Sequence, residues 1–280
     1  MSLATHAEQF RAQGYTVARG LFSPQEAAAL RTHLDRVRHD GPREDGDAGF
    51  DTASTDPLLQ WPRLLQVHRW DAASRDWLLD PRVTGRAASL LETTPLAVQC
   101  MVYFKPPGSR GQALHQDQYF IRARPGTCLA AWMALDDTDD ENGCIRVVPG
   151  SQDWPLLCPE PADTRVSFAR DSIPLPPGTP ELPIEMRAGD VLFFNGSLVH
   201  GSRPNHSDTR FRRALIGHFI ESRATSVVAW NQPVIAPDGQ ELWLEESAEG
   251  GPCGVWVDRD GEQAIAVTSA LPGADFLAPH

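Results

Sequence analysis

The chain has 280 residues, of which 41% are hydrophobic and 22% are charged, and these values are typical of a globular protein with one sizeable core. Its formal net charge of −12 disfavours nucleic acid as a partner, because proteins that bind a phosphate backbone depend on a positive surface. No apolar run predicts a membrane span, and residues 1–13 lack the apolar segment of a secretory signal. The five cysteines are scattered, odd in number and without a CxxC pair. This pattern predicts free thiols in a reducing, cytoplasmic compartment and no structural zinc site.

The first third of the chain predicts helices. Ser23, Pro24 and Glu26 are typical of a helix start, since Ser23 can cap the helix, Pro24 suits its first turn and Glu26 completes a capping box. This helix is expected to end near residue 38. Residues 40–56 are rich in Gly, Asp and Ser, which fits either a loop over a site or an ordinary surface loop. Shorter helices are predicted over residues 6–14, 74–79 and 82–91.

From about residue 95 the pattern changes to short strands separated by turn signals. Strands are expected over residues 96–105, 114–120, 127–135, 144–148, 184–186, 191–194 and 211–220. Residues 149–183 contain many prolines and are too long for an ordinary connection, so they are a candidate lid or substrate loop.

Many short strands with turns between them favour an antiparallel barrel or sandwich of jelly-roll type, with the helices packed outside. We expect one domain over residues 1–280. It divides into a helical part to about residue 94, a jelly-roll core over 95–222 and a C-terminal extension over 223–280.

The predicted strand over 114–120 carries two candidate metal ligands. His115 and Asp117 are two residues apart, and residues two apart on a strand point to the same face. An imidazole and a carboxylate are two of the three ligands of a 2-His-1-carboxylate site for non-heme Fe(II). His200 is the best candidate for the third ligand. A His-x-Asp triplet alone is weak, because most such triplets are incidental.

The predicted strand over 211–220 offers a cation for a co-substrate. If an Fe(II) held on one face binds 2-oxoglutarate, the far carboxylate of that co-substrate matches a bidentate arginine fork. Strand alternation places Arg212 with Ala214 and Ile216 on one face and Arg213 on the other. A buried arginine is costly without an anion, so an inward Arg212 implies a carboxylate partner. Spacing alone slightly favours the alternative, in which both arginines are exposed.

Several motifs, in order and with the right spacing, resemble the phytanoyl-CoA dioxygenase family. The matching runs are Tyr103-Phe104-Lys105-Pro106-Pro107-Gly108, His115-Gln116-Asp117, Ala131-Trp132-Met133-Ala134-Leu135, Glu141-Asn142-Gly143-Cys144, Val148-Pro149-Gly150-Ser151, His200-Gly201-Ser202 and Phe211-Arg212-Arg213-Ala214. The similarity extends from about Phe10 to Ile220 and is far more specific than the His-x-Asp triplet. It implies a mainly β, double-stranded β-helix (jelly-roll, cupin-like) core with flanking helices. It also implies an Fe(II)- and 2-oxoglutarate-dependent dioxygenase that hydroxylates a small molecule and releases succinate and CO₂.

The resemblance also implies roles for individual residues. The iron ligands would be His115, Asp117 and His200, and the 2-oxoglutarate residues would be Gln99, Lys105, Trp132, Ser202 and Arg212. Among these, Arg212 and Ser202 would hold the C5 carboxylate. The implied cofactors are Fe(II), 2-oxoglutarate and O₂, with ascorbate admitted as a reductant. Related halogenases have a small residue at the position of Asp117, so this carboxylate favours hydroxylation.

Two other function classes stay open. A metal-dependent hydrolase or isomerase could use the same three ligands with zinc, but it would not need Arg212 or Ser202 as an anion clamp. A catalytically silent binding member would keep the barrel, although the retained ligands weigh against it. The sequence specifies neither the substrate, including whether it is a CoA thioester, nor the oligomeric state. His68 fits a substrate-facing or a surface or core position, and His218 shares the face of Arg212 as a candidate interior residue.

Overall fold

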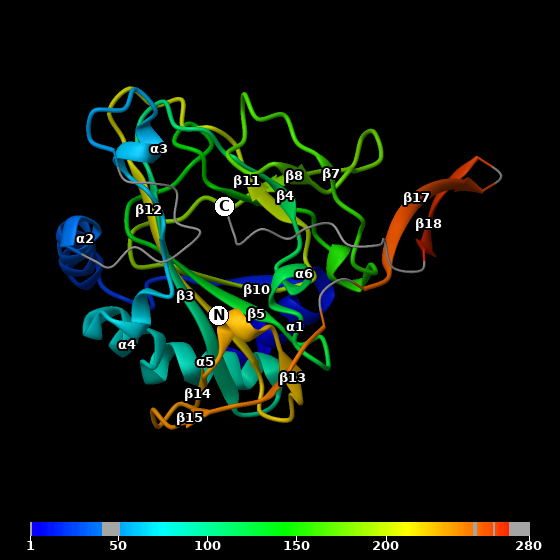
Figure 1. Ribbon diagram of the computed structural model, residues 1–280, viewed down its shortest axis with the longest axis horizontal. Coiled ribbons are helices and arrows are strands. Elements are labelled where there is room, and N and C mark those ends of the chain that lie inside the picture. Colours follow the sequence, from blue (N-terminus) through cyan, green and yellow to red (C-terminus); the bar gives the residue numbers. More distant parts are fainter. Residues whose placement is uncertain (1, 41–50, 249–250, 260, 269–280) are drawn as a thin grey trace.

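Two antiparallel sheets lie face to face in the computed structural model, which describes residues 2–40, 51–248, 251–259 and 261–268 (Figure 1). The larger sheet contains, in spatial order, β1 (Tyr15–Ala18), β10 (Val191–Asn195), β5 (Leu129–Ala134), β12 (Arg212–Glu221), β3 (Pro95–Lys105), β14 (Val234–Ile235) and β15 (Glu241–Leu242), with β2 (Leu64–Leu65) also paired to β3. The smaller sheet contains β4 (Gln112–His115), β11 (His200–Ser202), β6 (Ile145–Val147) and β9 (Leu182–Pro183). This arrangement is the predicted jelly-roll core.

The larger sheet has two apolar faces because its side chains alternate between them. Its inner face, which is the one toward the smaller sheet, carries Ala214 and Ile216 of β12 together with Trp132 of β5. These residues pack with Ile145 and other side chains of the smaller sheet. Functional side chains that share this face therefore point into the space between the sheets.

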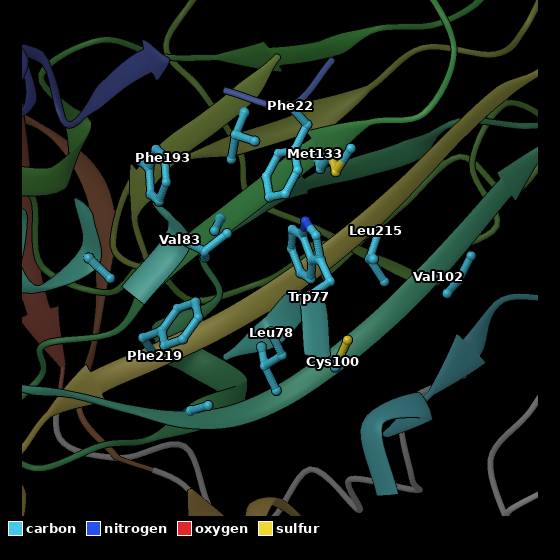
Figure 2. Close-up of a cluster of buried hydrophobic side chains, with 14 of the residues drawn as sticks. Phe22, Trp77, Leu78, Val83, Cys100, Val102, Met133, Phe193, Leu215 and Phe219 are labelled. Atoms are coloured by element: carbon cyan, nitrogen blue, oxygen red, sulfur yellow. The ribbon is translucent and has the colours of Figure 1, made fainter. Parts of the chain in front are cut away.

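Helices cover the outer face of the larger sheet. They are α1 (Leu3–Gln13), α2 (Pro24–Asp40), α4 (Ala72–Leu78) and α5 (Pro81–Leu91). Figure 2 shows Trp77 and Leu78 of α4 among buried side chains that include Val83, Met133 and Leu215. Burial of apolar side chains on both faces explains why the strands read as nearly continuous apolar runs.

The predicted helix start at Ser23 is confirmed. The Ser23 backbone N–H donates to Glu26 Oε2 at 2.8 Å, and the Glu26 N–H donates to Ser23 Oγ at 3.2 Å, which is the reciprocal pattern of a capping box. The first helix begins at Leu3, earlier than expected, because Ser2 accepts from the Thr5 N–H and caps it.

Two of the expected strands are wrong in extent. The strand predicted over 114–120 ends at His115, and residues 118–121 form the short helix α6 (Gln118–Ile121). The run Tyr-Phe-Ile suits either state, and the Gln118 N–H is held by the Gly196 carbonyl at 2.8 Å, a tertiary contact that local pattern does not reveal. Residues 184–186 lie outside the named strands, although Ile184 and Met186 are buried.

Short elements complete the described chain. They are α3 (Pro57–Gln60), the 3-10 turns η1 (Val67–Arg69), η2 (Ser151–Asp153) and η3 (Ala229–Asn231), and the two-residue strands β7 (Glu160–Pro161), β8 (Asp171–Ser172), β13 (Ser226–Val227) and β16 (Glu245–Glu246). Of the loop expected over 40–56, residues 41–50 lie outside the described residues. No helix in the described ranges is long and apolar enough to cross a bilayer.

The expectation that all five cysteines are free thiols is wrong. Cys158, in the proline-rich segment 149–183, forms a disulfide with Cys253 at a sequence separation of 95 residues. Cys253 begins the hairpin of β17 (Cys253–Arg259) and β18 (Glu262–Thr268), which stands out from the rest of the molecule in Figure 1. The other three cysteines are free and buried. Neither an odd count nor the spacing could identify a pair so far apart in the chain.

Candidate active site

Three candidate metal ligands meet between the sheets. One nitrogen each of His115 and His200 and one carboxylate oxygen of Asp117 lie within 4.8 Å of one another. His115 ends β4 and His200 begins β11, and the two residues are direct partners in the antiparallel pair. Asp117 reaches the same point from the residue before α6, with helical backbone angles. The expectation that strand alternation aligns Asp117 with His115 was therefore wrong in mechanism, because a turn does it.

The two imidazoles are oriented for metal binding. His115 Nδ1 lies 2.9 Å from the Ala113 carbonyl, and His200 Nδ1 lies 3.0 Å from the Leu198 carbonyl. A carbonyl can only accept, so each Nδ1 carries a hydrogen and each Nε2 is the ring nitrogen left to bind a metal. The Nε2 atoms face Asp117, at 3.4 Å for His115 and 3.6 Å for His200. This donor set fits an Fe(II) ion or another divalent metal.

The protonation of the cluster also suits a metal. Burial lowers the pKa of His200 to about 4, so its ring is neutral at pH 7. Burial alone would raise the pKa of Asp117, but the neighbouring histidines outweigh it and hold the pKa well below its usual range. His200 therefore offers a neutral imidazole and Asp117 an ionised carboxylate without the loss of a proton.

His218 of β12 is a fourth buried group at the cluster. Its Nε2 lies 3.0 Å from Asp117 Oδ2, and its side chain is 2% exposed. The strand alternation that places it with Arg212 on the inner face predicted an interior position. The contact with Asp117 joins residues 101 positions apart in the sequence, so no local signal could reveal it.

A buried cation pair lies on the same inner face. Arg212 and Lys105 are partners in the β12–β3 ladder and are 4% and 2% exposed. Lys105 Nζ donates to Ser202 Oγ at 2.8 Å, and Arg212 Nη2 lies 3.5 Å from the same hydroxyl. Both side chains also donate to the Gly143 carbonyl. Ser202 is two residues beyond His200 on β11, so the pair sits beside the candidate metal ligands.

Among the described residues, neither Arg212 nor Lys105 forms an ion pair with a carboxylate, whereas the adjacent Arg213 binds Asp35 and Asp136, each at 2.9 Å. Burial lowers the pKa of Arg212 to about 10, and burial together with the charge of Arg212 holds the pKa of Lys105 well below its usual range. Two buried basic side chains without a carboxylate partner call for an anionic ligand.

Comparison with known proteins agrees with this geometry. A family model described as phytanoyl-CoA dioxygenase (PhyH) matches residues 10–214, which is most of the chain. The chain belongs to the phytanoyl-CoA dioxygenase family. A phytanoyl-CoA dioxygenase of Arabidopsis thaliana is 27% identical over 247 residues, which cover 76% of this chain and 87% of the plant protein. Phytanoyl-CoA dioxygenase 1 of Oryza sativa subsp. japonica is 30% identical, and that match covers 61% of this chain and 62% of the rice protein.

A solved structure shows the same fold within a related enzyme. The non-heme α-ketoglutarate-dependent carbocyclase SnoK from nogalamycin biosynthesis superposes with a TM-score of 0.63 at 25% sequence identity. The match covers 80% of this chain and 86% of SnoK. SnoK is a carbocyclase, so similarity at this level extends to enzymes whose reaction is not a hydroxylation.

Two further residues were singled out by the family resemblance. One lies near Arg212 and Lys105, and the other lies toward the metal ligands. Trp132 is buried, and its ring lies 5.4 Å from the Arg212 guanidinium carbon, so it belongs to the cation end. Gln99 is the ladder partner of His218 on the inner face, which places it toward the metal ligands.

One further histidine and two neighbours of the site complete the comparison with sequence. His68 is buried in η1, and burial lowers its pKa to about 3, which fits a core position. Sequence reasoning missed Gln112, whose amide nitrogen lies 3.1 Å from His115 Nε2. It also missed Tyr103, which strand alternation alone would place on the inner face between Met101 and Lys105.

Proposed function

We propose that this member of the phytanoyl-CoA dioxygenase family is an Fe(II)- and 2-oxoglutarate-dependent dioxygenase that hydroxylates a small molecule, forming succinate and CO₂. The observation that carries the proposal is the buried, unneutralised pair of Arg212 and Lys105 beside the His115, Asp117 and His200 cluster. A dicarboxylate that chelates the metal at one end needs such a cation at the other.

The chain's own groups divide the work of binding. His115, Asp117 and His200 would hold the metal, which when bound supplies the activation of O₂ and the oxidative decarboxylation of 2-oxoglutarate. Arg212 would bind the C5 carboxylate through two N–H groups, and Lys105 and Ser202 would add a charge and a hydroxyl on the other side. Gln99 would face the metal end of the co-substrate, and Trp132 would wall the cation end and exclude water.

A zinc hydrolase is the second candidate, and the cation pair disfavours it. Hydrolysis at a zinc-bound water needs the three ligands but gives Arg212 and Lys105 no anion to bind. The carboxylate of Asp117 favours hydroxylation over halogenation, because related halogenases have a small residue at this position. Because the disulfide removes the cysteine argument for a cytoplasmic location, we propose no compartment.

The test is co-substrate turnover without a known substrate. Purified protein given Fe(II), O₂ and 2-oxoglutarate labelled at C1 should slowly form succinate and release the label as CO₂. Zinc should not replace iron in this reaction. His200→Ala should abolish both metal binding and turnover. His206→Ala is the matched control, because His206 is exposed in a nearby turn. Turnover that persists in His200→Ala, or hydrolysis supported by zinc alone, would contradict the proposal.

A further inference from the structure

Besides Arg212, a second arginine lies on the inner face of the larger sheet. Arg63 directly precedes β2, whose Leu64 and Leu65 pair with Val102 and Met101 of β3. Leu64 packs with the outer core, so the alternation places Arg63 and Leu65 on the inner side. Extension of the same register sets Arg63 beside Tyr103.

The guanidinium of Arg63 has one edge without partners. Its Nε and Nη2 atoms are buried, and neither has a hydrogen-bond partner among the described residues. These two atoms form the side of the guanidinium that presents parallel N–H bonds to a carboxylate. Arg110, by contrast, is paired, with its Nη2 2.8 Å from Asp56 Oδ2. A buried, charged donor pair left unsatisfied is costly, so Arg63 is poised for an anion.

Aromatic side chains complete this position, which we call the rim and define as Arg63, Tyr103 and Phe168. The Arg63 guanidinium carbon lies 5.6 Å from the centre of the Phe168 ring, and the Tyr103 and Phe168 rings are 6.1 Å apart. Phe168 belongs to the segment 149–183 that the sequence marks as a candidate substrate loop.

The rim is within reach of the metal ligands. The Phe168 N–H donates to the Gly111 carbonyl at 3.0 Å, and the next residue after Gly111 begins the strand that ends at His115. Four residues of strand span about 13 Å, which is the length of a small organic molecule. A compound held at the rim by an anionic group could therefore present its other end to the metal.

From this arrangement we infer that Arg63 binds a carboxylate of the organic substrate, with Tyr103 and Phe168 against its apolar part. The inference rests on the proposed function and deepens it, because it specifies the substrate class as small organic acids. The substrate carboxylate and the 2-oxoglutarate carboxylate would then occupy separate arginines, Arg63 and Arg212.

The test uses the full chain loaded with Zn(II) and saturating 2-oxoglutarate, so that the Arg212 site is filled. The probes are hexanoate, benzoate, phenylacetate and 3-phenylpropionate, each compared with its own primary amide, and phenyl phosphate, all observed by saturation-transfer NMR. At least one acid should bind while its amide does not. Arg63→Leu should weaken that acid about 30-fold or more, the usual effect of removing one partner of a buried charged pair.

Two further variants separate binding from folding. Arg110→Gln removes a nearby arginine that is already paired and should leave acid binding unchanged. Arg63→Lys keeps the charge but not the fork and should bind the acid more weakly than wild type and more tightly than Arg63→Leu. The inference is overturned if no acid binds, if acids and amides bind alike, if phenyl phosphate binds more tightly than every acid, or if Arg63→Leu binds as wild type does.

The same preparations report separately on the proposed function. Succinate formed from 2-oxoglutarate with Fe(II) and no organic substrate should be equal in wild type and Arg110→Gln. A failed acid screen with intact succinate formation would overturn only the role of Arg63. Absence of succinate formation in the wild type would instead contradict the dioxygenase assignment.

Discussion

Arg212 and Arg213 are adjacent on β12, yet they have opposite environments. Arg212 points inward toward Ser202 and Lys105, and Arg213 points outward to Asp35 and Asp136. Arg212→Ala should weaken 2-oxoglutarate binding about 30-fold or more, because a buried bidentate pair loses one partner. Metal binding should stay nearly unchanged. Calorimetry with 2-oxoglutarate on both variants measures this, and Arg213→Ala is the control that should change the affinity little.

We expect His218 to position the metal ligand Asp117 without contacting the metal itself. Its hydrogen bond at 3.0 Å holds Asp117 Oδ2 and leaves the other oxygen for the ion. His218→Leu should weaken Mn(II) binding about 10- to 100-fold, the range found when partners of metal ligands are removed. His218→Gln, which keeps an N–H donor, should recover part of the loss. Electron paramagnetic resonance of Mn(II) reads the affinity directly, and equal affinities for the Leu and Gln variants would contradict a positioning role.

Lys105 gives the co-substrate site a pH dependence. Burial and the nearby Arg212 hold its pKa well below the usual value, and the thiol of Cys144 opposes this slightly. A bound carboxylate favours the charged amine, so the pKa of Lys105 should rise when 2-oxoglutarate binds. Binding then takes up protons between the lowered and the raised pKa, and the affinity falls as pH rises through that window. Calorimetry in buffers of different ionisation enthalpy should detect proton uptake that is absent in Lys105→Met.

At the scale of elements, the disulfide ties the hairpin of β17 and β18 to the proline-rich segment 149–183. Cys253→Ser should lower the free energy of unfolding by about 2–4 kcal/mol, because the crosslink closes a long loop. The hairpin keeps other contacts, including the bond from Trp256 Nε1 to the Pro174 carbonyl, so it should stay docked but become more sensitive to protease. Cys158→Ser and the double variant should match Cys253→Ser in urea unfolding, and a double variant that is much less stable would contradict a shared origin.

Contacts between residues distant in the sequence mark the limit of what local sequence patterns predict. The alternation of Arg212 and Arg213, the capping box at Ser23 and most core strands follow from local rules, and the structure contains them. The turn that places Asp117 beside His115 depends instead on the hydrogen bond from the Gln118 N–H to the Gly196 carbonyl, and these two residues are distant in sequence. The pairing of Cys158 with Cys253 is of the same kind. Local pattern fixes the face on which a side chain lies, but contacts between distant segments decide where chain segments bend and join.

At the scale of the whole molecule, family motifs singled out more residues of the candidate site than periodicity did. His115 and His200 are 85 positions apart, and only their antiparallel partnership across β4 and β11 brings the rings to 4.1 Å. Without the family motifs, His200 was the best candidate for the third ligand but was not assigned to the site. The resemblance selected it because the order of motifs along the chain reflects the order of strands in the barrel. The role of Arg63 lies beyond both kinds of signal, since it depends on unpartnered atoms that only the packed structure reveals.

The site is built from both sheets, and this has a mechanical consequence. Arg212, Lys105 and His218 belong to the larger sheet, whereas His115, His200 and Ser202 belong to the smaller one. An ion and a dicarboxylate bound between them would link the two sheets and oppose their separation. Saturation at 100 times the dissociation constant should add about 2.7 kcal/mol to the free energy of unfolding. Hydrogen exchange should then slow on β4 and β11 of the smaller sheet as well as on β12 of the larger one, so that amides of both sheets report whether the ion and the dicarboxylate are bound.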